Sequence, residues 1–342
     1  MSSAKAVAFI SKTGQEFRVT GETSAFGVAH KQQIDEASSF DLASITKVLA
    51  TTTILMRAVE SGQITLSDRV GKFIPEWSLG EKSEITIEDL LRHESGLEEW
   101  RPFYISCKAP EAAYSMIAGL RLKYPIRKEF HYSDLNFIVL GQLVSVIFGG
   151  SIAEIFEAEV ARPIGLSSTR FATPVDRNNV VATSIGDSIE RRMVESKIPY
   201  DVPEKASDFS RWRSEVLSGE INDGNAFHLF GGIAGHAGLF STLTDLTRYI
   251  HGLLDGFIAP AILNAFAQPR NFLEQGIGFK RFALPNGGHA LGHFGFTGTG
   301  FAVDIAKGTG LVYLSNRLHT HGEYRPMAEI WSDEFKEFSS RG

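Results

Sequence analysis

The sequence predicts an α+β fold in which both ends of the chain build one mixed sheet around a mainly helical segment. Runs with β-like character occur near the N-terminus and in the last quarter of the chain, whereas apolar residues at helical spacing dominate between them. Strands and helices therefore do not alternate, which argues against a doubly wound parallel sheet. We expect residues 1–62 and 230–342 to form a sheet domain with terminal helices, and residues 63–229 to form a mainly helical domain with long loops.

The N-terminal part predicts a hairpin followed by a long helix. The β-like runs Ala6–Ser11 and Gln15–Thr20 are separated by a short segment ending in Gly14, which is typical of a glycine-containing turn. From Asp41 onward, apolar residues recur every three or four positions until Gly62, a residue type suited to end a helix. A helix that begins at Asp41 is therefore expected.

Two further helices carry start signals in the middle of the chain. Thr86-Ile-Glu-Asp89 has the pattern of a capping box ahead of two leucines. Ser133 or Asp134 can cap the apolar run Leu135–Phe148, which two glycines end. Between residues 172 and 225 the apolar content drops, and we expect long loops with short helices that form an insertion or cover a cleft.

The last third of the chain returns to strands. A glycine-rich segment over residues 231–238 precedes a helix that Thr242 can cap. Four strand-like runs then cover residues 276–283, 289–296, 300–305 and 310–316, and an amphipathic helix covers residues 324–338. Together with the N-terminal hairpin, these runs predict one sheet built from both termini.

Composition excludes several classes of protein. With 342 residues, 43% of them apolar and 22% charged, the chain is typical of a globular protein of about two domains. A net charge of −6 disfavours binding to nucleic acid or to an anionic membrane, and the single Cys107 cannot form an internal disulfide. The longest apolar stretch, residues 137–150, is too short to span a bilayer, and the first ten residues lack signal-peptide features. We expect a cytoplasmic protein as the sequence stands, or a periplasmic or exported one if a leader has been removed.

The spacing Ser44-Ile-Thr-Lys47 is the first candidate for chemistry. At the start of a helix, residues three apart lie on one face, so the lysine can reach the serine hydroxyl. A buried, neutral lysine can take the hydroxyl proton, and the helix N-terminus favours the negative charge that develops. The pattern is weak by itself, because 31 serines and 14 lysines in 342 residues give about one match by chance, and Ser2 with Lys5 is another match.

Tyr132 stands just before the expected helix 135–148 and is a second candidate. A tyrosine fixed there presents its hydroxyl to a cleft and transfers protons if a nearby cation lowers its pKa. Packing of the ring on the first helical turn is the alternative, which the local pattern favours.

The glycine-rich strand over residues 292–300 is a third candidate. Glycine in a strand allows a ligand or another backbone to approach closely, so a substrate can lie against this strand. The backbone N–H groups of Phe296 and Ser44 then form an oxyanion hole. A glycine bulge that bends the strand is an equally good interpretation.

These three segments, in this order, resemble the Ser-x-x-Lys, Tyr-x-Asn and Lys-Thr-Gly or His-x-Gly motifs of the serine β-lactamase and penicillin-binding protein superfamily. The likeness is closest to the branch with class C β-lactamases, D-Ala-D-Ala carboxypeptidases, family VIII esterases and peptidoglycan amidases. It includes the framework segments 40–47, 85–97, 231–242 and 296–300. The resemblance implies a β-lactamase/transpeptidase-like fold, with an antiparallel sheet flanked by terminal helices beside a helical domain.

The resemblance also implies a serine hydrolase that forms an acyl-enzyme and needs no metal or organic cofactor. Ser44 becomes the nucleophile, Lys47 its general-base partner and Tyr132 the proton shuttle to the leaving group. The N–H groups of Ser44 and Phe296 become the oxyanion hole. The implied substrates are small acyl compounds or muropeptides, with weak β-lactam reactivity, and the oligomeric state stays open.

Two departures from the family pattern bear on the substrate. Asp134 stands where these enzymes usually have asparagine, and an ionised carboxylate only accepts hydrogen bonds, whereas an amide also donates them. His293, Phe294 and Gly295 replace Lys-Thr-Gly, which removes an ammonium and a hydroxyl that grip the substrate carboxylate in the family. The sequence therefore favours an ester or amide substrate without a carboxylate at that position, over a β-lactamase or D-Ala-D-Ala carboxypeptidase proper.

Functions of another class stay open as alternatives. His319 and His321 suggest a metal-dependent hydrolase, but no His-Glu-x-x-His or Cys/His cluster accompanies them, and a surface loop is the favoured interpretation. His93 is expected to be structural near a helix C-terminus, and His236 in a glycine-rich turn fits either interpretation. A binding or sensor protein that keeps the fold without turnover is the third alternative.

Overall fold

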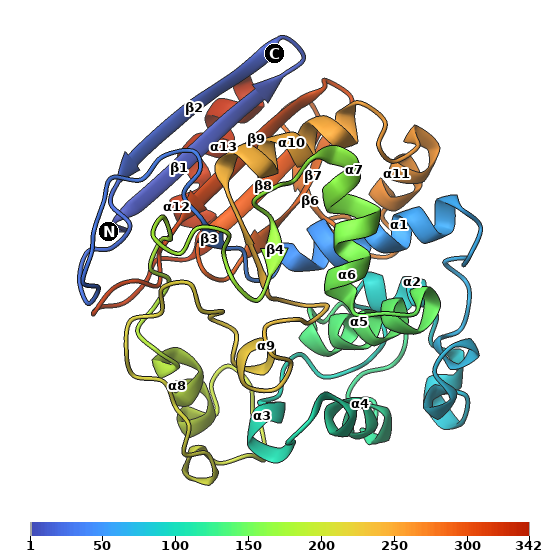
Figure 1. The fold of residues 1–342 in the computed structure, drawn as a ribbon. Helices are drawn as coiled ribbons and strands as arrows, with labels where there is room; N and C mark the ends of the chain where they lie inside the picture. Colours follow the sequence, from blue (N-terminus) through green and yellow to red (C-terminus); the bar gives the residue numbers. More distant parts are fainter. Residues whose placement is uncertain (1, 342) are drawn as a thin grey trace.

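The computed structural model describes residues 2–341, and its largest element is a six-stranded antiparallel sheet (Figure 1). The strands are β1 (Ala4–Ser11), β2 (Gly14–Gly21), β6 (Lys280–Ala283), β7 (His289–Gly295), β8 (Thr299–Asp304) and β9 (Thr309–Ser315). Their order in the sheet is β2-β1-β9-β8-β7-β6, so β1 from the N-terminus pairs with β9 from the C-terminus. The predicted α+β fold, with a sheet built from both termini, is confirmed.

Helices cover both faces of this sheet. Side chains alternate along a strand, so Ala6 and Ala8 of β1 face the larger core, which includes buried residues of α10 (Leu243–Leu254). Val7 and Phe9 face the opposite side and belong to a smaller core with Trp331. That core lies under α12 (Met327–Ile330) and α13 (Ser332–Ser340).

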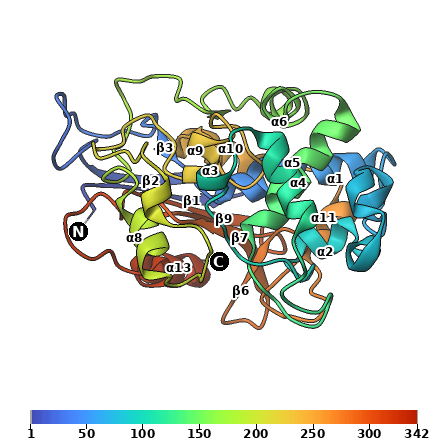
Figure 2. The ribbon, with the colours of Figure 1, turned by 90° about the horizontal axis from the view of Figure 1, so that it is seen from below.

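The middle of the chain is mostly helical and lies below the sheet in Figure 1. Its central helix is α5 (Asp134–Phe148), which packs against α2, α4 and α6 (Figure 2). The other helices of the chain are α1 (Thr53–Glu60), α2 (Ile87–Leu91), α3 (Phe103–Ser106), α4 (Pro110–Gly119), α6 (Ile152–Phe156), α7 (Arg162–Ile164), α8 (Ser188–Ser196), α9 (Gly224–His228) and α11 (Pro260–Ala267). A small sheet joins β3 (Phe40–Asp41), β5 (Leu239–Ser241) and β4 (Arg170–Phe171).

No single helix within residues 2–341 is long and apolar enough to cross a membrane. The helical segments Asp134–Phe148 and Ile152–Ile164 reach that length and hydropathy only together, and a bend of 74° separates them.

Several local predictions are confirmed. Strands β1 and β2 form the expected hairpin. Thr86 and Asp89 make the two reciprocal hydrogen bonds of a capping box at the start of α2, and Thr242 caps α10 by accepting from the Asp245 N–H. Gly149 ends α5 in the left-handed conformation, with φ of 73°.

The helix expected to begin at Asp41 starts later, so that prediction is wrong. Asp41 ends β3, and its carboxylate accepts hydrogen bonds from the N–H groups of Ala43 (2.8 Å) and Asn222 (2.7 Å). The chain turns here before a π-helical segment, Lys47–Thr52, leads into α1. Apolar spacing does not detect this start, because it is set by the pairing of β3 with β5, which is distant in sequence.

Three further boundaries differ from the prediction. The strand expected from residue 276 begins at Lys280, because the Gly276 N–H bonds the Phe279 carbonyl in a turn. The helix expected over residues 324–338 is divided into α12 and α13, and α12 begins only at Met327, since Pro326 disfavours helix in the residue before it. Ser133 precedes α5, but its hydroxyl donates to the Glu98 carbonyl (2.6 Å) and does not cap the helix.

Candidate active site

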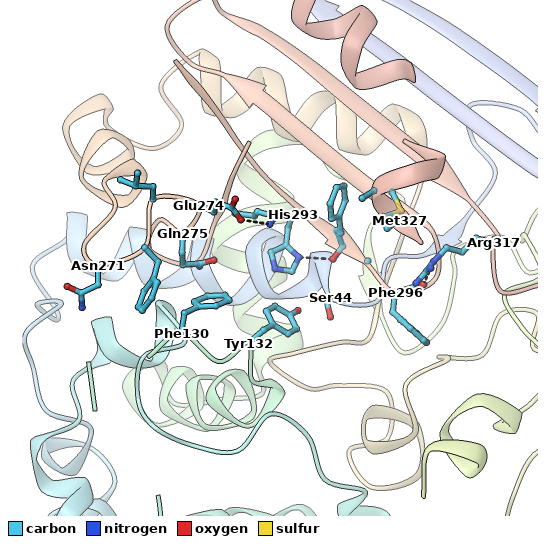
Figure 3. Close-up of a pocket in the computed structure, with 16 residues that line it drawn as sticks. Ser44, Phe130, Tyr132, Asn271, Glu274, Gln275, His293, Phe296, Arg317 and Met327 are labelled. Atoms are coloured by element: carbon cyan, nitrogen blue, oxygen red, sulfur yellow. Dashed lines mark hydrogen bonds and ion pairs between the residues drawn. The ribbon is translucent and has the colours of Figure 1, made fainter. Parts of the chain in front are cut away.

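Ser44 lies between β3 and the first helix, at a cavity of about 830 Å³ (Figure 3). The lining of this cavity includes Ser44, Tyr132, His293, Gly295 and Phe296. A second cavity, of about 610 Å³, also reaches Ser44, Tyr132 and Phe296 and includes Asp134 in its wall. With Lys47 buried beside Ser44, the structure brings the seven residues expected to act in catalysis or substrate binding to one place.

Lys47 is fully buried and its ammonium faces the Ser44 hydroxyl. Its Nζ donates to Ser44 Oγ at 2.7 Å and to the backbone carbonyl of His236 at 3.1 Å. The Lys47 N–H also bonds the Ser44 carbonyl, so one turn of chain fixes the two side chains relative to each other. Serine and lysine are therefore placed for proton transfer between them.

Asp134 forms an ion pair with Lys47, with 2.8 Å between Nζ and Oδ1. Burial by itself lowers the pKa of Lys47, but the Asp134 carboxylate and the Tyr132 side chain oppose this, and the net pKa lies above its ordinary value. The Asp134 carboxylate therefore favours the ammonium form of Lys47 over the neutral amine that is expected to act as the base.

Tyr132 lies over the same ammonium, with 5.1 Å from Lys47 Nζ to the ring centre. Its side chain lines both cavities together with Ser44. Burial raises the pKa of the phenol, the Lys47 cation acts against it, and the net pKa is above the ordinary value. The condition set for proton transfer by Tyr132, a pKa lowered by a nearby cation, is therefore not met in this state, because desolvation outweighs the cation.

His93 positions the segment that carries Tyr132. Its Nδ1 accepts a hydrogen bond from the Ser133 N–H at 3.0 Å, and its ring lies 4.6 Å from the Tyr132 ring. Burial, and then Lys47 and His293, hold the pKa of His93 well below its usual range. The expected structural role of His93 is confirmed. The imidazole is neutral, however, so it has no favourable charge interaction with the C-terminus of the preceding helix.

His293 lines the cavity from β7 and is also neutral. Burial and the nearby Lys47 lower its pKa to about 3. Its Nδ1 lies 2.7 Å from the Phe294 carbonyl, and since a carbonyl only accepts, the proton is on Nδ1. The imidazole therefore brings no positive charge to the cavity.

The Phe294 ring packs at the rim of the cavity with the second core. It lies 5.0 Å from the ring of Phe282 and 5.0 Å from that of Trp331. The residue thus contributes an apolar rim where the family motif has a hydroxyl.

Only glycine fits at position 295, because the backbone of Leu42 and the side chain of Thr299 lie where a Cβ atom would be. A Cβ at this position would lie 2.3 Å from the Leu42 carbonyl oxygen and 2.1 Å from Thr299 Oγ1. The pairing of β7 with β8 is continuous up to Gly295 and Thr299, which contradicts a bulge. Phe296 follows in the turn between these strands and not in the strand itself, so its expected place is corrected.

Sequence reasoning missed two half-buried acids, Glu190 and Asp223, in the wall of the second cavity. Asp223 Oδ1 lies 3.0 Å from Nε2 of His236, the residue whose carbonyl accepts from Lys47. Glu190 accepts from the Gly224 N–H at 2.8 Å, and burial and then the charge of Asp223 raise its pKa to about 8. The position of His236 in a glycine-rich segment was the only sequence signal for this group, because Glu190 comes from α8 and Asp223 from the N-cap of α9, both distant in sequence from Lys47.

The proposed histidine pair does not lie on a simple surface loop. His319 is buried, its Nε2 lies 2.9 Å from Ser24 Oγ, and the Phe26 ring stacks on His319 at 4.1 Å and on His321 at 4.0 Å. The surface-loop interpretation is wrong for His319, because Phe26 and Ser24 enclose it. Within residues 2–341, no group of three or more His, Cys, Asp or Glu side chains is arranged to hold a metal ion.

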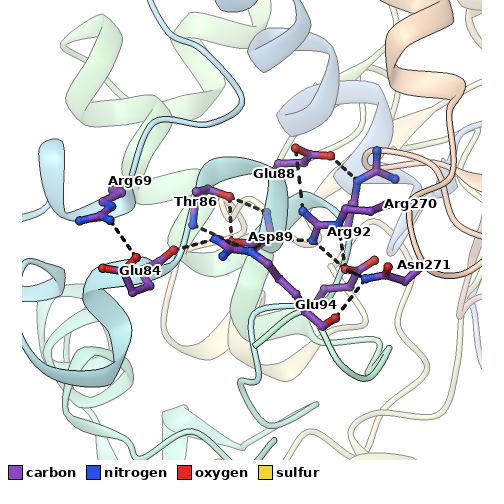
Figure 4. Close-up of polar contacts among 10 residues, drawn as sticks. Arg69, Glu84, Thr86, Glu88, Asp89, Arg92, Glu94, Arg270 and Asn271 are labelled. Carbon is purple, nitrogen blue, oxygen red and sulfur yellow. Dashed lines mark hydrogen bonds and ion pairs between the residues drawn. The ribbon is translucent and has the colours of Figure 1, made fainter. Parts of the chain in front are cut away.

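An ion-pair network fixes the far wall of the 830 Å³ cavity (Figure 4). Arg270 donates to Glu94 at 2.6 Å and to Asp89 at 2.8 Å. Asn271, which lines the cavity, donates to Glu94 at 3.0 Å and to the Arg127 carbonyl at 3.0 Å. The segment that carries this wall is therefore tied to the end of α2.

Comparisons with known proteins agree with this geometry. A model of the Beta-lactamase family matches residues 7–332. A protein of Escherichia coli K12 named "Putative D-alanyl-D-alanine carboxypeptidase" is 27% identical over 316 residues, which cover 82% of this chain and 69% of that protein. The N-acetylmuramyl-L-alanine amidase of Bacillus subtilis 168 is 27% identical over 317 residues, 82% of this chain and 68% of that protein. A crystal structure of a class C beta lactamase, 15% identical, shares the fold with a TM-score of 0.74 over 96% of this chain and 90% of that chain.

Proposed function

This chain belongs to the Beta-lactamase family and is a serine hydrolase, and we propose that its acyl-enzyme forms on Ser44. We further propose that it cleaves ester or amide bonds of peptidoglycan-like peptides or small acyl compounds. The observation that carries the proposal is the buried Lys47 ammonium, 2.7 Å from the Ser44 hydroxyl at the edge of a large cavity.

Acylation needs a base for the Ser44 proton, and Lys47 supplies one in its neutral form. When Nζ has given its proton to solvent, a neutral amine lies 2.7 Å from Ser44 Oγ. The amine takes the hydroxyl proton as Oγ attacks the substrate carbonyl. Tyr132, whose ring centre lies 5.1 Å from Lys47 Nζ, then passes a proton to the leaving group and is reprotonated by Lys47.

The negative charge on the attacked carbonyl oxygen is met by two backbone donors. Within residues 2–341, the N–H groups of Ser44 and Phe296 have no acceptor. The segment that leads to Ser44 and the segment that leads to Phe296 pass close to each other at Leu42 and Gly295. No side chain fits there, because a Cβ at Gly295 would lie 2.3 Å from the Leu42 carbonyl oxygen. Donors fixed in this way stabilise a developing oxyanion without reorganisation.

Two observations support a cell-wall peptide or small acyl substrate. The named relatives are a carboxypeptidase and an amidase of D-alanyl and muramyl substrates. Neutral His293 and apolar Phe294 leave no cation at the third motif, which disfavours a β-lactamase that grips a carboxylate at that position. Esters and amides are therefore the proposed main substrates, and β-lactams are weak ones.

Intact-protein mass spectrometry tests the nucleophile. The protein is incubated with a fluorophosphonate or with a penicillin, and peptide mapping then locates the adduct. We expect one adduct on Ser44 and no labelling of Ser44→Ala at equal concentration. Full turnover of a short-chain ester by Ser44→Ala would contradict the proposal, as would an adduct on another serine.

Replacing Asp134 by asparagine is expected to shift the pH profile of acylation. The carboxylate is what holds the pKa of Lys47 above its ordinary value, and burial alone acts in the opposite direction. Without it, neutral amine is present at lower pH, so the acid limb of kcat/KM moves down by about one pH unit or more. Stopped-flow acylation measured from pH 5 to 10 checks this, with Asp134→Glu as the control that keeps the charge. An acid limb that stays in place or moves to higher pH contradicts the assignment.

A further inference from the structure

We propose that His293 and Gln275 bind a neutral hydrogen-bond donor on the leaving group of the substrate, of the kind that a primary carboxamide presents. The inference rests on the proposed function and deepens it, because it names the chemical group that this chain accepts in place of a carboxylate. Two buried acceptor atoms that face one another in the 830 Å³ cavity carry it.

His293 presents an acceptor nitrogen to the cavity. Its Nδ1 carries the proton, because the Phe294 carbonyl at 2.7 Å only accepts, so Nε2 of the neutral imidazole is an acceptor. The residue lines the cavity and is only 7% exposed, and its Nε2 has no hydrogen-bond partner within residues 2–341. A buried acceptor in this state is stabilised by a ligand that supplies the donor.

Gln275 supplies a second acceptor and is equally buried. Its Nε2 donates to the Gly276 carbonyl at 3.2 Å, which leaves the amide oxygen, Oε1, without a partner in the described part of the chain. A turn fixes this segment, since the Gly276 N–H bonds the Phe279 carbonyl at 2.9 Å. In Figure 3 the amide oxygen of Gln275 points toward the ring of His293.

Two acceptors that face one another need a donor between them. A primary carboxamide carries two N–H donors on one nitrogen, so it can bond both Nε2 of His293 and Oε1 of Gln275. A carboxylate has acceptors only, and its charge would be desolvated there without a donor. Phe130, Phe272 and Phe294 line the same cavity, and such apolar surroundings increase the cost of an unpaired polar group.

The two acceptors lie next to the residue that protonates the leaving group in the proposed mechanism. The ring centres of His293 and Tyr132 are 5.8 Å apart. His293 is also only three residues before Phe296, the proposed oxyanion donor, and β7 leads from one to the other. A group bound by His293 and Gln275 is therefore carried by the leaving group, close to the bond that is cleaved.

One cation, Lys280, lies at the rim of this subsite. It is paired in the sheet with Gly292, the residue before His293, but its ammonium faces the Glu274 carboxylate at 3.8 Å. Both side chains of this ion pair are exposed, so solvent screens the charge of Lys280. The buried acceptors are therefore the groups that select the ligand.

The test compares three esters that share one acyl group. Their leaving groups are 2-hydroxypropanamide, 3-hydroxybutan-2-one and 2-hydroxypropanoate, so an NH₂ group is replaced by a methyl group of similar size or by a carboxylate oxygen. Each kcat/KM is divided by the rate constant of alkaline hydrolysis of the same ester. We expect the wild-type protein to prefer the carboxamide over the ketone and over the carboxylate by about tenfold or more, because the ketone loses the hydrogen bonds and leaves buried acceptors unpaired.

Two single variants locate the preference. Gln275→Met and His293→Phe each remove one acceptor and retain a side chain of similar size. In each of them the preference for the carboxamide over the ketone is expected to fall to about threefold or less. Glu274→Gln changes the neighbouring, exposed residue of the same cavity and is the matched control, which keeps the wild-type preference within about twofold.

Each outcome has one meaning. Equal normalised rates for the carboxamide and the ketone in the wild-type protein overturn the inference and leave the proposed function intact, and so does a preference for the carboxylate. A preference for the carboxamide that survives either substitution overturns it too, because the pair then does not select the donor. Turnover of the esters by Ser44→Ala overturns the proposed function itself. Thermal unfolding identifies a misfolded variant, and the other variant and the wild-type comparison then decide.

Discussion

Replacement of Lys47 by methionine is expected to lower kcat/KM for an ester substrate by about 10³-fold or more. Methionine matches the length of the lysine stem but has no proton to exchange with Ser44 Oγ, which lies 2.7 Å from Nζ. It also removes the donor to the His236 carbonyl and the group that reprotonates Tyr132. Stopped-flow acylation by a fluorophosphonate and steady-state ester hydrolysis measure the loss. Activity within tenfold of wild type would contradict the assignment of the base.

The same substitution is expected to lower stability, and a double variant separates the two effects. Lys47→Met leaves the Asp134 carboxylate without its partner, and removing one member of a buried pair destabilises by about 3–5 kcal/mol. Asp134 is 17% exposed, so the lower end of that range applies. In Lys47→Met with Asp134→Asn, no charge is left unpaired, so the free energy of unfolding recovers while activity does not. Urea denaturation and ester hydrolysis of the three variants test this, and recovery of both together would contradict it.

Replacement of Asp89 by asparagine is expected to lower the free energy of unfolding by about 3–5 kcal/mol. The Asp89 side chain is fully buried and accepts from Arg127 at 2.7 Å, from Arg270 at 2.8 Å and from the Thr86 N–H at 2.9 Å (Figure 4). Asparagine leaves both guanidinium groups without this carboxylate and weakens the capping box of α2. Chemical denaturation measures the loss.

The effect of Asp89 depends on pH in a defined direction. Burial acts to raise its pKa, but hydrogen bonds from Arg127, the Thr86 backbone and Arg270 outweigh it, and the folded-state pKa is lowered. A lowered folded-state pKa stabilises the protein above the unfolded value of about 4, and this contribution is lost as the pH falls through the folded-state value. The difference between wild type and Asp89→Asn is therefore largest near neutral pH and shrinks below about pH 4. A difference that is constant from pH 7 to pH 3 would contradict this.

Glu84 provides the control for this prediction. Its ion pair with Arg69 appears in the same network, but both side chains are more than half exposed, at 56% and 58%. Solvent screens such a pair, so Glu84→Gln is expected to change stability by less than about 1 kcal/mol. If Glu84→Gln lowered the free energy of unfolding as much as Asp89→Asn, the stabilisation by this network would depend on the number of its charges and not on their burial.

Much of the fold was predictable because its signals are local. Hairpin turns, the capping box at Thr86, the glycine that ends α5 and strand alternation all depend on a few neighbouring residues. The start of the first helix was not predictable, because Asp41 pairs with β5 and accepts a hydrogen bond from the Asn222 N–H of a distant loop. Boundaries set by such long-range pairing carry no periodic signal in the sequence.

The candidate site also has features that local sequence signals predict and features that depend on distant segments. Ser44, Lys47 and Tyr132 were found from spacing and motif order, and the structure brings them to one cavity. Their pKa values could not be predicted, because the pKa of a buried group depends on what surrounds it. Asp134, from the start of another helix, raises the pKa of Lys47, and desolvation raises that of Tyr132.

The fold class, the family motifs and the residues proposed to react with a substrate follow from residue order and spacing along the chain. The low pKa of His293 and the packing of Phe294 with the second core follow only from the folded arrangement. Ser44 and Lys47 are three residues apart, so one turn of chain brings them together whatever the rest of the chain does. Charge and desolvation in the cavity depend instead on segments that meet only after the two ends of the chain have formed the sheet.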